Sequence, residues 1–214
     1  MFQWLEAIIL GLVQGLTEFI PISSSGHLVI AQTFLSGASD HLFLEFINIG
    51  TMLALFVFFR KRIWAIIQDV FVNKNLKLAR NIIITALPAG IVGFVLAGFI
   101  AATPFFASAT VVVFTLAIVG IVMVVLEKLP KLSAVKDGEK LPWQRALIIG
   151  FAQVLALIPG TSRSGSTIIA GRLMGLKPAQ AAEYSFLASL PIMAGVTLKV
   201  LVSDNDYLME HLPT

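Results

Sequence analysis

The chain has 214 residues, of which 57% are hydrophobic and 13% are charged, and its mean hydropathy is +0.92. These values lie outside the range of soluble domains and predict an all-α, polytopic membrane protein. The sequence has no cysteine, which excludes a disulfide framework and a thiolate metal site. Its net charge of +3 comes from basic residues between apolar stretches, so it predicts membrane orientation and no nucleic acid partner.

The first apolar run of the chain is broken by a Pro/Ser/Gly segment, and the whole pattern recurs. Residues 7–31 align without a gap to residues 146–170, with ten identities over 25 positions. Self-similarity of this kind predicts a structural duplication. We expect a single membrane domain over 1–214, with one repeat over about 1–127 and a second over about 145–214.

Longer apolar stretches follow the first copy, and each is close to the ~20 residues that cross a bilayer. They are Leu42–Phe59, Ile82–Ala102, Thr110–Leu126 and, beyond the second copy, Ser185–Val202. The connections over 60–80 and 128–145 are rich in Lys and Arg, which predicts that both are cytoplasmic. The links near 36–41 and 100–108 and the tail after Val202 have no Lys or Arg, so we expect them outside.

With this orientation the first copy begins outside the membrane and the second begins inside. Turns at Pro21–Gly26 and Pro159–Gly165 then predict two re-entrant helix hairpins of an inverted-topology repeat, with their tips near the midplane. Irregular backbone at that depth must be buried or line a wet cavity, which predicts a polar pocket between the tips. The second copy has no counterpart for the last two crossings of the first, so we expect a truncated chain.

The turn of the first copy carries a cluster of polar side chains. Glu18 follows Gln14 by four residues, so both lie on one helical face. Because burying a charge inside the membrane is costly, Glu18 is expected to have a charged partner or a function. Pro21 ends the helix, and Ser23, Ser24, Ser25 and Gly26 lead into the next one. Such serines commonly cap a helix, but a helix start surrounded by hydroxyls also binds anions.

His27 follows Ser24 by three residues and is expected to share its face, either as a hydrogen-bond partner of Glu18 or in the chemistry. In the second copy Arg163 replaces the serine equivalent to Ser24, between Ser162 and Ser164. Arg163 is either a structural counter-ion for Glu18 or a clamp for phosphate, whose oxygens match a guanidinium bidentately.

The two turns therefore divide their chemistry. One supplies acid, hydroxyl and imidazole, and the other supplies positive charge, which is the combination that phosphoryl transfer requires. Ser166 and Thr167 are expected to add hydroxyl donors. Glu45 and Glu183 are expected on the crossings nearest the pocket, as structural partners.

Two segments carry a resemblance to a known family. GLVQGLTEFIPISSSGH (11–27) and LIPGTSRSGSTI (157–168) resemble the two signatures of the undecaprenyl-diphosphate phosphatases, the bacitracin-resistance membrane proteins. The first signature has Glu or Gln at position 14 and Glu at position 18. The resemblance implies hydrolysis of undecaprenyl diphosphate to the monophosphate and phosphate, which recycles the lipid carrier of cell-wall synthesis. It places the protein in the bacterial cytoplasmic (inner) membrane, with the active site open to the periplasmic side.

The same resemblance implies roles for individual residues. Glu18, Ser24, His27 and Arg163 would be catalytic, with the choice of Ser24 or His27 as nucleophile left open. Glu18, with Gln14, would hold part of a divalent cation, Mg²⁺ or Ca²⁺. The expected substrate-binding set is Ser23, Ser25, Gly26, Ser162, Ser164, Gly165, Ser166 and Thr167. The expected partners are a polyprenyl diphosphate, membrane lipids and, in a homodimer, a second copy of the chain.

Two other classes of protein share some of these features. A secondary transporter or lipid flippase would use the same inverted repeats and midplane site without breaking a bond, so phosphate release separates it from a phosphatase. A membrane scaffold would use Glu18 and Arg163 only as a buried ion pair, and their removal would then cost stability rather than activity alone.

Overall fold

The computed structural model describes residues 3–35, 41–128 and 138–203, and within these ranges the regular secondary structure is helical. Among the described residues, three segments are long and apolar enough to cross a membrane: α5 (Lys77–Val95), α7 (Ala109–Lys128) and Pro178–Lys199 of α10 (Pro178–Ser203). Shorter apolar segments lie in α3 (His41–Phe58) and over Trp143–Leu157. The chain is thus an all-α, multi-pass membrane protein.

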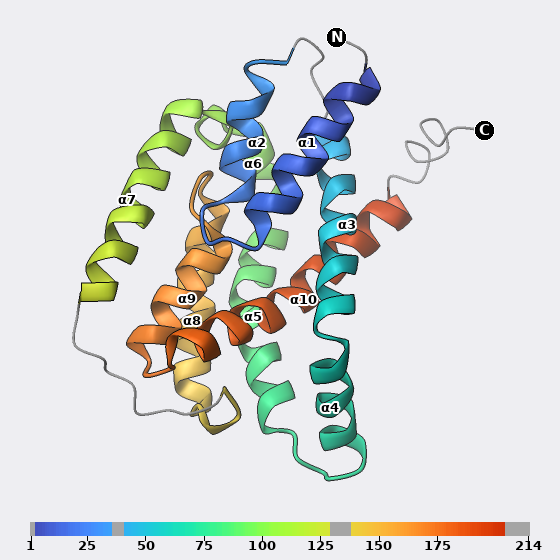
Figure 1. Ribbon diagram of the computed structural model, residues 1–214, viewed down its shortest axis with the longest axis vertical. Coiled ribbons are helices and arrows are strands. Elements are labelled where there is room, and N and C mark those ends of the chain that lie inside the picture. The colour runs from blue at the N-terminus through green and yellow to red at the C-terminus, as the bar shows by residue number, and fades with distance from the viewer. Residues whose placement is uncertain (1–2, 36–40, 129–137, 204–214) are drawn as a thin grey trace.

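Two helical hairpins contain the repeated sequence. The first consists of α1 (Gln3–Glu18) and α2 (Ser24–Gln32). The second consists of α8 (Trp143–Val154), the short 3₁₀ helix η3 (Leu155–Leu157) and α9 (Arg163–Leu173). In Figure 1 the α1–α2 hairpin turns at its lower end, whereas the α8–α9 hairpin turns at its upper end.

The order of elements follows the sequence duplication. A shift of 139 residues moves α1 onto α8 with η3, moves α2 onto α9, and moves α3 onto the first part of α10. The N-cap of α2, Ser23, moves onto the N-cap of α9, Ser162. The repeat in sequence is therefore also a repeat of helix starts and ends.

The remaining elements correct two expectations. Ile82–Ala102 was expected as one stretch, but the helix ends at Val95 and α6 (Ala97–Ala102) follows, in a segment that several glycines weaken. The basic connection over 60–80 contains α4 (Arg60–Phe71) and the start of α5. Its charges mask an apolar face of helical period on α4, formed by Trp64, Ile67 and Phe71.

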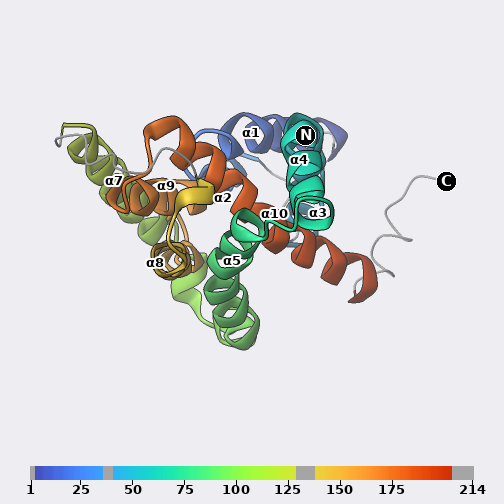
Figure 2. The ribbon, with the colours of Figure 1, turned by 90° about the horizontal axis from the view of Figure 1, so that it is seen from below.

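Two short 3₁₀ helices complete the chain, η1 (Pro104–Ala107) after α6 and η2 (Gly138–Lys140) before α8. Seen from below, α7 lies on one side of the molecule and α3 with α4 on the other, while α10 crosses between them (Figure 2).

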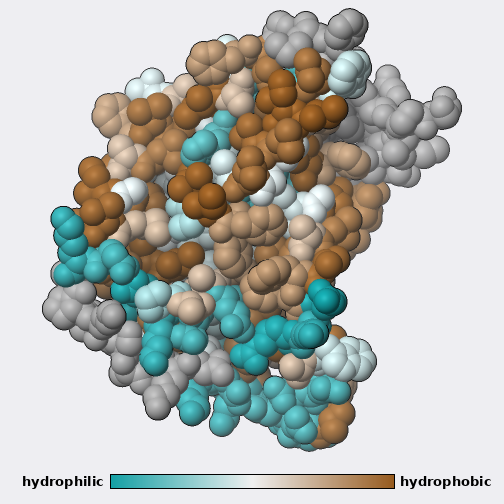
Figure 3. Space-filling view, viewed as in Figure 1, coloured by the Kyte–Doolittle hydropathy of each residue, from teal (hydrophilic) through white to brown (hydrophobic). Residues whose placement is uncertain are grey.

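The surface separates an apolar belt from a polar end. Figure 3 shows hydrophobic residues over the upper and middle parts and hydrophilic residues at the lower end. Helix α7, for example, exposes Phe114, Ile118 and Val124, as a lipid-facing helix does. The predicted links over 36–40 and the tail from residue 204, with Asp204, Asp206 and Glu210, lie outside the described residues, as do Lys131 and Lys136.

Helices α5, α8 and α10 pack around a buried polar cluster. The Tyr184 hydroxyl of α10 donates to the Asn81 carbonyl at 2.9 Å and lies 2.7 Å from the Thr85 hydroxyl. The Asn81 amide in turn donates to the Leu141 carbonyl at 2.7 Å, just before α8. These bonds satisfy buried polar groups and fix the start of the second hairpin relative to α5.

The two hairpin turns touch at glycines. A Cβ atom on Gly26 would lie 3.4 Å from the Gly160 Cα, and one on Gly165 would lie 3.3 Å from the Pro21 carbonyl oxygen. Gly160 is 139 residues after Pro21, and Gly165 is 139 residues after Gly26. The two contacts are therefore one pair of equivalent positions with the roles exchanged.

Gly160 is the position where this packing is least tolerant. Its φ is +80°, and a Cβ there would lie 2.2 Å from the Thr115 hydroxyl and 2.6 Å from the Val112 carbonyl oxygen of α7. We expect Gly160→Ala to lower stability by at least about 2 kcal/mol, because it adds a clash to a left-handed backbone. Thermal unfolding in detergent, followed by circular dichroism, measures this.

Gly120→Ala is the matched control, since Gly120 lies on α7 with open space around it. Alanine is the better helix former, so this variant should melt at or slightly above the wild-type temperature. Equal melting temperatures for the two variants would contradict the packing described for the turn.

Candidate functional site

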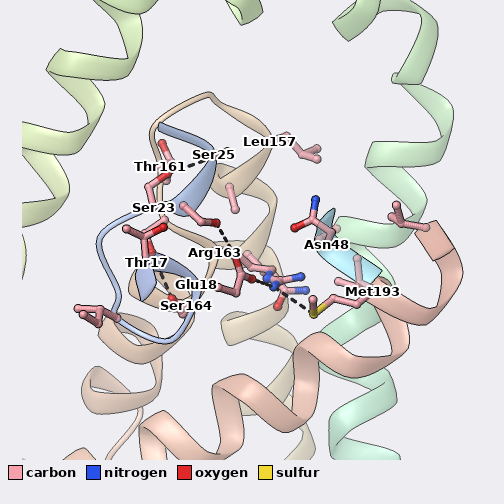
Figure 4. Close-up of a pocket in the computed structure, with 18 of the residues that line it drawn as sticks. Thr17, Glu18, Ser23, Ser25, Asn48, Leu157, Thr161, Arg163, Ser164 and Met193 are labelled. Carbon is pink, nitrogen blue, oxygen red and sulfur yellow. Dashed lines mark hydrogen bonds and ion pairs between the residues drawn. The ribbon is translucent and has the colours of Figure 1, made fainter. Parts of the chain in front are cut away.

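A cavity of about 240 Å³ lies between the two hairpin turns. That volume far exceeds the ~10–15 Å³ that one water needs. Besides both turns, α3, α5 and α10 contribute to its wall. Figure 4 shows Glu18 and Arg163 near its centre, with Ser23 and Thr161 on one side and Asn48 and Met193 on the other.

Glu18, the last residue of α1, receives donors from three directions. Arg163 Nη2 lies 2.5 Å from Oε1, while Gln14 Nε2 donates to Oε2 at 3.0 Å. The Ser24 hydroxyl also donates to Oε2. A carboxylate has two oxygens that can accept from all three donors at once, and the Arg163 guanidinium lies against it as an opposite charge.

Arg163 is held where the second helix pair turns. It is the first residue of α9, and the preceding Ser162 caps the helix by accepting from the Gly165 N–H at 3.0 Å. Its Nη2 also lies 3.4 Å from the Met193 sulfur, a weak acceptor. The side chain is 25% exposed. Arg163 thus has one strong partner and retains donors that an anion in the cavity would accept from.

Ser24 occupies the equivalent place in the first hairpin, as the first residue of α2. The N-cap Ser23 accepts from the Gly26 N–H at 3.4 Å and has φ = +66°. This left-handed conformation costs roughly 1–2 kcal/mol for a residue with a side chain. The cost is consistent with a turn constrained to direct the Ser24 hydroxyl at Glu18.

His27 does not take the expected place beside Glu18. Its Nδ1 lies 2.8 Å from the Ser23 carbonyl oxygen, which can only accept, so Nδ1 carries the proton of that bond. The ring therefore anchors to the backbone of its own turn and is absent from the described residues that line the cavity. A role for His27 in proton transfer would have to use Nε2.

The remaining sequence-predicted residues fall into two groups. Ser23, Ser25, Ser162 and Ser164 line the cavity, whereas Gly26 and Gly165 provide the close contact between the turns. Ser166 and Thr167 point away, contrary to expectation: Ser166 donates to the Ser162 carbonyl at 2.9 Å and Thr167 to the Arg163 carbonyl at 2.9 Å. As the fourth and fifth residues of α9, both hydroxyls bond to backbone carbonyls of the preceding turn instead of facing the cavity.

A family model described as "Bacitracin resistance protein BacA" matches residues 7–213. The chain belongs to this family. The match includes α1 from Ala7 on and every later helix through α10. From the two segments that carry the resemblance, Glu18, Ser24 and Arg163 line the cavity.

Curated relatives cover most of the chain. This chain is 40% identical over 207 residues to the undecaprenyl-diphosphatase of Rubrobacter xylanophilus, and the aligned region covers 91% of this chain and 75% of the relative. It is 40% identical over 193 residues to that of Methanococcus vannielii, covering 89% and 76% respectively. The undecaprenyl-diphosphatase of Marinobacter nauticus is 36% identical over 215 residues, covering 96% and 80%.

The donor set suits a divalent cation only in part. Gln14 is 1% exposed, and its Oε1 is buried without a hydrogen-bond partner. Among the described residues that line the cavity, Glu18 supplies the carboxylate, and no group of three acidic, His or Cys side chains forms in the described chain. At the cavity Glu18 is the carboxylate that a divalent cation would use, and such an ion would take most of its other ligands from phosphate and water.

Sequence reasoning missed several residues of the cavity. Asn48 of α3, Gln153 of α8 and Met193 of α10 all line it. Asn48 could have been found from the sequence, because it is a polar residue inside the apolar stretch Leu42–Phe59. Glu183, expected near the pocket, instead pairs with Arg62 of α4 at 2.8 Å, and the side chain of Glu45 lies outside the described residues.

Replacing the central carboxylate should destabilise the protein. In Glu18→Gln one of the two side-chain ends becomes a donor, so at least one of the three donors loses its acceptor, at a cost of about 1–3 kcal/mol. Glu183→Gln is the matched control, because the Arg62–Glu183 pair is 34% and 40% exposed and such pairs contribute ~1 kcal/mol at most. Thermal unfolding of both variants in detergent measures the difference, and equal losses would refute a special place for Glu18.

Proposed function

We propose that the protein is an undecaprenyl-diphosphate phosphatase, which hydrolyses this lipid to undecaprenyl phosphate and inorganic phosphate and so recycles the carrier for cell-wall synthesis. The observation that carries the proposal is the Glu18 carboxylate, which joins the Ser24 hydroxyl of one turn to the Arg163 guanidinium of the other. A nucleophile, a base and a phosphate-binding cation thus meet at one cavity. The curated relatives carry the name of the same activity.

The proposed reaction begins at Ser24. Its oxygen attacks the terminal phosphorus while Glu18, already its hydrogen-bond acceptor, takes the hydroxyl proton. The bond between the terminal phosphorus and the bridging oxygen breaks, and that oxygen leaves with the lipid monophosphate. Water then attacks the phosphoserine, which releases inorganic phosphate and restores the hydroxyl. Glu18 is the base in this scheme because the structure directs Ser24 at it, whereas His27 is bonded to the Ser23 carbonyl.

Charge on the phosphate would be met by this chain from two sides. Arg163 exchanges its bond with Glu18 for bonds to phosphate oxygens, for which its planar fork is suited. The N-termini of α2 and α9 begin at Ser24 and Arg163, so the positive ends of both helix dipoles lie at the cavity. A divalent cation held in part by Glu18 would add further neutralisation of the phosphate oxygens.

The architecture proposed from the sequence accompanies this function. The two hairpins would be re-entrant halves of an inverted repeat, and the exchanged contacts of Gly26 with Gly160 and of Gly165 with Pro21 support that symmetry. The cavity would open to the periplasmic side of the bacterial cytoplasmic membrane, with the prenyl chain in the lipid. The homodimer remains a prediction.

Phosphate release from undecaprenyl diphosphate in detergent tests the activity. We expect Ser24→Ala to lower kcat by at least about 100-fold, because it removes the attacking oxygen. Arg163→Lys keeps the charge but loses the fork, and a loss of roughly 100-fold is expected. Chelation of divalent cations by EDTA should also reduce the rate.

Ser108→Ala and Arg172→Lys are the controls, as Ser108 caps α7 and Arg172 pairs with Glu127 at the far end of α9. Both should release phosphate at near wild-type rates. Transport of the intact lipid by folded protein, without phosphate release, would replace the phosphatase with a transporter.

The nucleophile can be identified separately. Rapid quenching with substrate labelled at the terminal phosphate should trap label on Ser24, in an acid-stable phosphate ester, and peptide mass spectrometry would locate it. Acid-labile label on His27 would overturn the serine mechanism.

A further inference from the structure

Asn48 belongs to neither hairpin, yet it lines the cavity from α3, opposite Ser23 and Thr161 (Figure 4). Its Nδ2 donates to the Leu44 carbonyl one turn earlier, at 3.1 Å. Because a backbone carbonyl can only accept, this bond settles which end of the amide is the nitrogen. The Oδ1 atom therefore faces α1 as an acceptor.

That acceptor is used by Gln14. Gln14 Nε2 lies 2.6 Å from Asn48 Oδ1 and 3.0 Å from Glu18 Oε2. An amide nitrogen has two N–H groups, and here both are engaged by acceptors. With its nitrogen held at two points, Gln14 leaves Oε1 on the other side, buried and without a partner.

We propose that Asn48 is a positioning residue: it fixes the side-chain amide of Gln14, so that the nitrogen of Gln14 donates to the Glu18 carboxylate. The inference extends the proposed function by naming a residue of α3 that acts on the base through Gln14. A direct line of bonds then runs from the α3 backbone through Asn48 and Gln14 to Glu18.

The orientation of the Gln14 amide is maintained although it leaves Oε1 without a hydrogen-bond donor. A buried acceptor without a donor costs about 1–3 kcal/mol, and rotation of Gln14 would relieve that cost if nothing held the amide. Asn48 and Glu18 together prevent the rotation, because each requires the nitrogen end. The buried, unpartnered oxygen is therefore a sign that the two acceptors hold the Gln14 amide in one orientation.

A neighbouring buried residue of α3, Thr51, allows the effect of Asn48 on Gln14 to be separated from a general effect on α3. Thr51 lies one turn further along α3, is 5% exposed, and donates only within its own helix, to the Asn48 carbonyl at 2.9 Å. Thr51→Val therefore perturbs the buried face of α3 without touching Gln14. It is the matched control for Asn48→Leu, which preserves size but removes the acceptor.

The test is a double-mutant cycle with two readouts. Phosphate release gives kcat and KM for Asn48→Leu, Gln14→Met and the double variant. Side-chain ¹⁵N NMR of protein labelled at glutamine reports the Gln14 amide directly, whether or not the protein is active. Gln14→Met assigns that signal, and Asn48→Asp keeps an acceptor oxygen at position 48.

We expect Asn48→Leu to lower kcat about 10–100-fold with little change in KM, as loss of a partner behind a reacting group does. In the Gln14→Met background the same change should cost less than about 2-fold, since there is no amide left to position. The Gln14 NMR signal should shift in Asn48→Leu and stay near its wild-type position in Asn48→Asp and Thr51→Val.

Equal losses of kcat from Asn48→Leu in both backgrounds would overturn the inference, because Asn48 would then act without Gln14. An unchanged Gln14 signal in folded Asn48→Leu would overturn it as well. If the wild-type protein released no phosphate, the proposed function would fail, whereas the NMR comparison would still decide whether Asn48 positions Gln14.

Discussion

The structure depends on one ion pair, between Glu18 of the first hairpin and Arg163 of the second. Either charge alone inside an apolar protein surface would be costly, and each is compensated only while the two turns stay together. The packing around the pair serves that requirement. Gly26 and Gly165 let the turns approach to backbone contact, and α7 closes over Gly160. The cavity is the space that remains around a charge pair held in this way.

The hydrogen-bond partners of Glu18 and Arg163 include the groups of the proposed chemistry. Glu18 accepts from three side chains, but each comes from a different part of the chain, and two of them, Ser24 and Arg163, have roles in the proposed chemistry. The third, Gln14, ties the carboxylate to α3 through Asn48. Met193 gives Arg163 a second, weak acceptor at 3.4 Å.

Much of the site follows from rules that act along the chain. The turn after Glu18, the serine caps and the second helix start were predictable, because Pro, Ser and Gly act on the backbone locally. Arg163 had two interpretations from the sequence, a counter-ion for Glu18 and a clamp for phosphate, and the structure shows the ion pair of the first. Local rules also explain the errors. Thr167 bonds its own helix, as Ser and Thr often do, and a glycine-rich segment divides the expected span at Leu96.

What could not be predicted depends on contacts between distant segments. Asn48 reaches Gln14 only because α3 packs beside α1, and Gln153 reaches the Thr85 carbonyl only because Gly150 admits α5 closely. No spacing within one segment encodes such pairs. They become visible only when the helices are placed in space.

The exchanged glycine contacts have a bearing on how such a protein could arise. If the two hairpins were identical and related by a two-fold axis, every contact between unlike positions would occur twice, so a carboxylate at position 18 and an arginine at the position of Ser24 would form two ion pairs. The copies instead differ: a leucine stands at 157 where the first copy has Glu18, and Arg163 stands where the first has Ser24. Divergence of this kind is available only to halves that are inherited together and mutate separately. Because the two copies lie in one chain, each can change without the other, so one turn can carry the carboxylate and the hydroxyl while the other carries the cation.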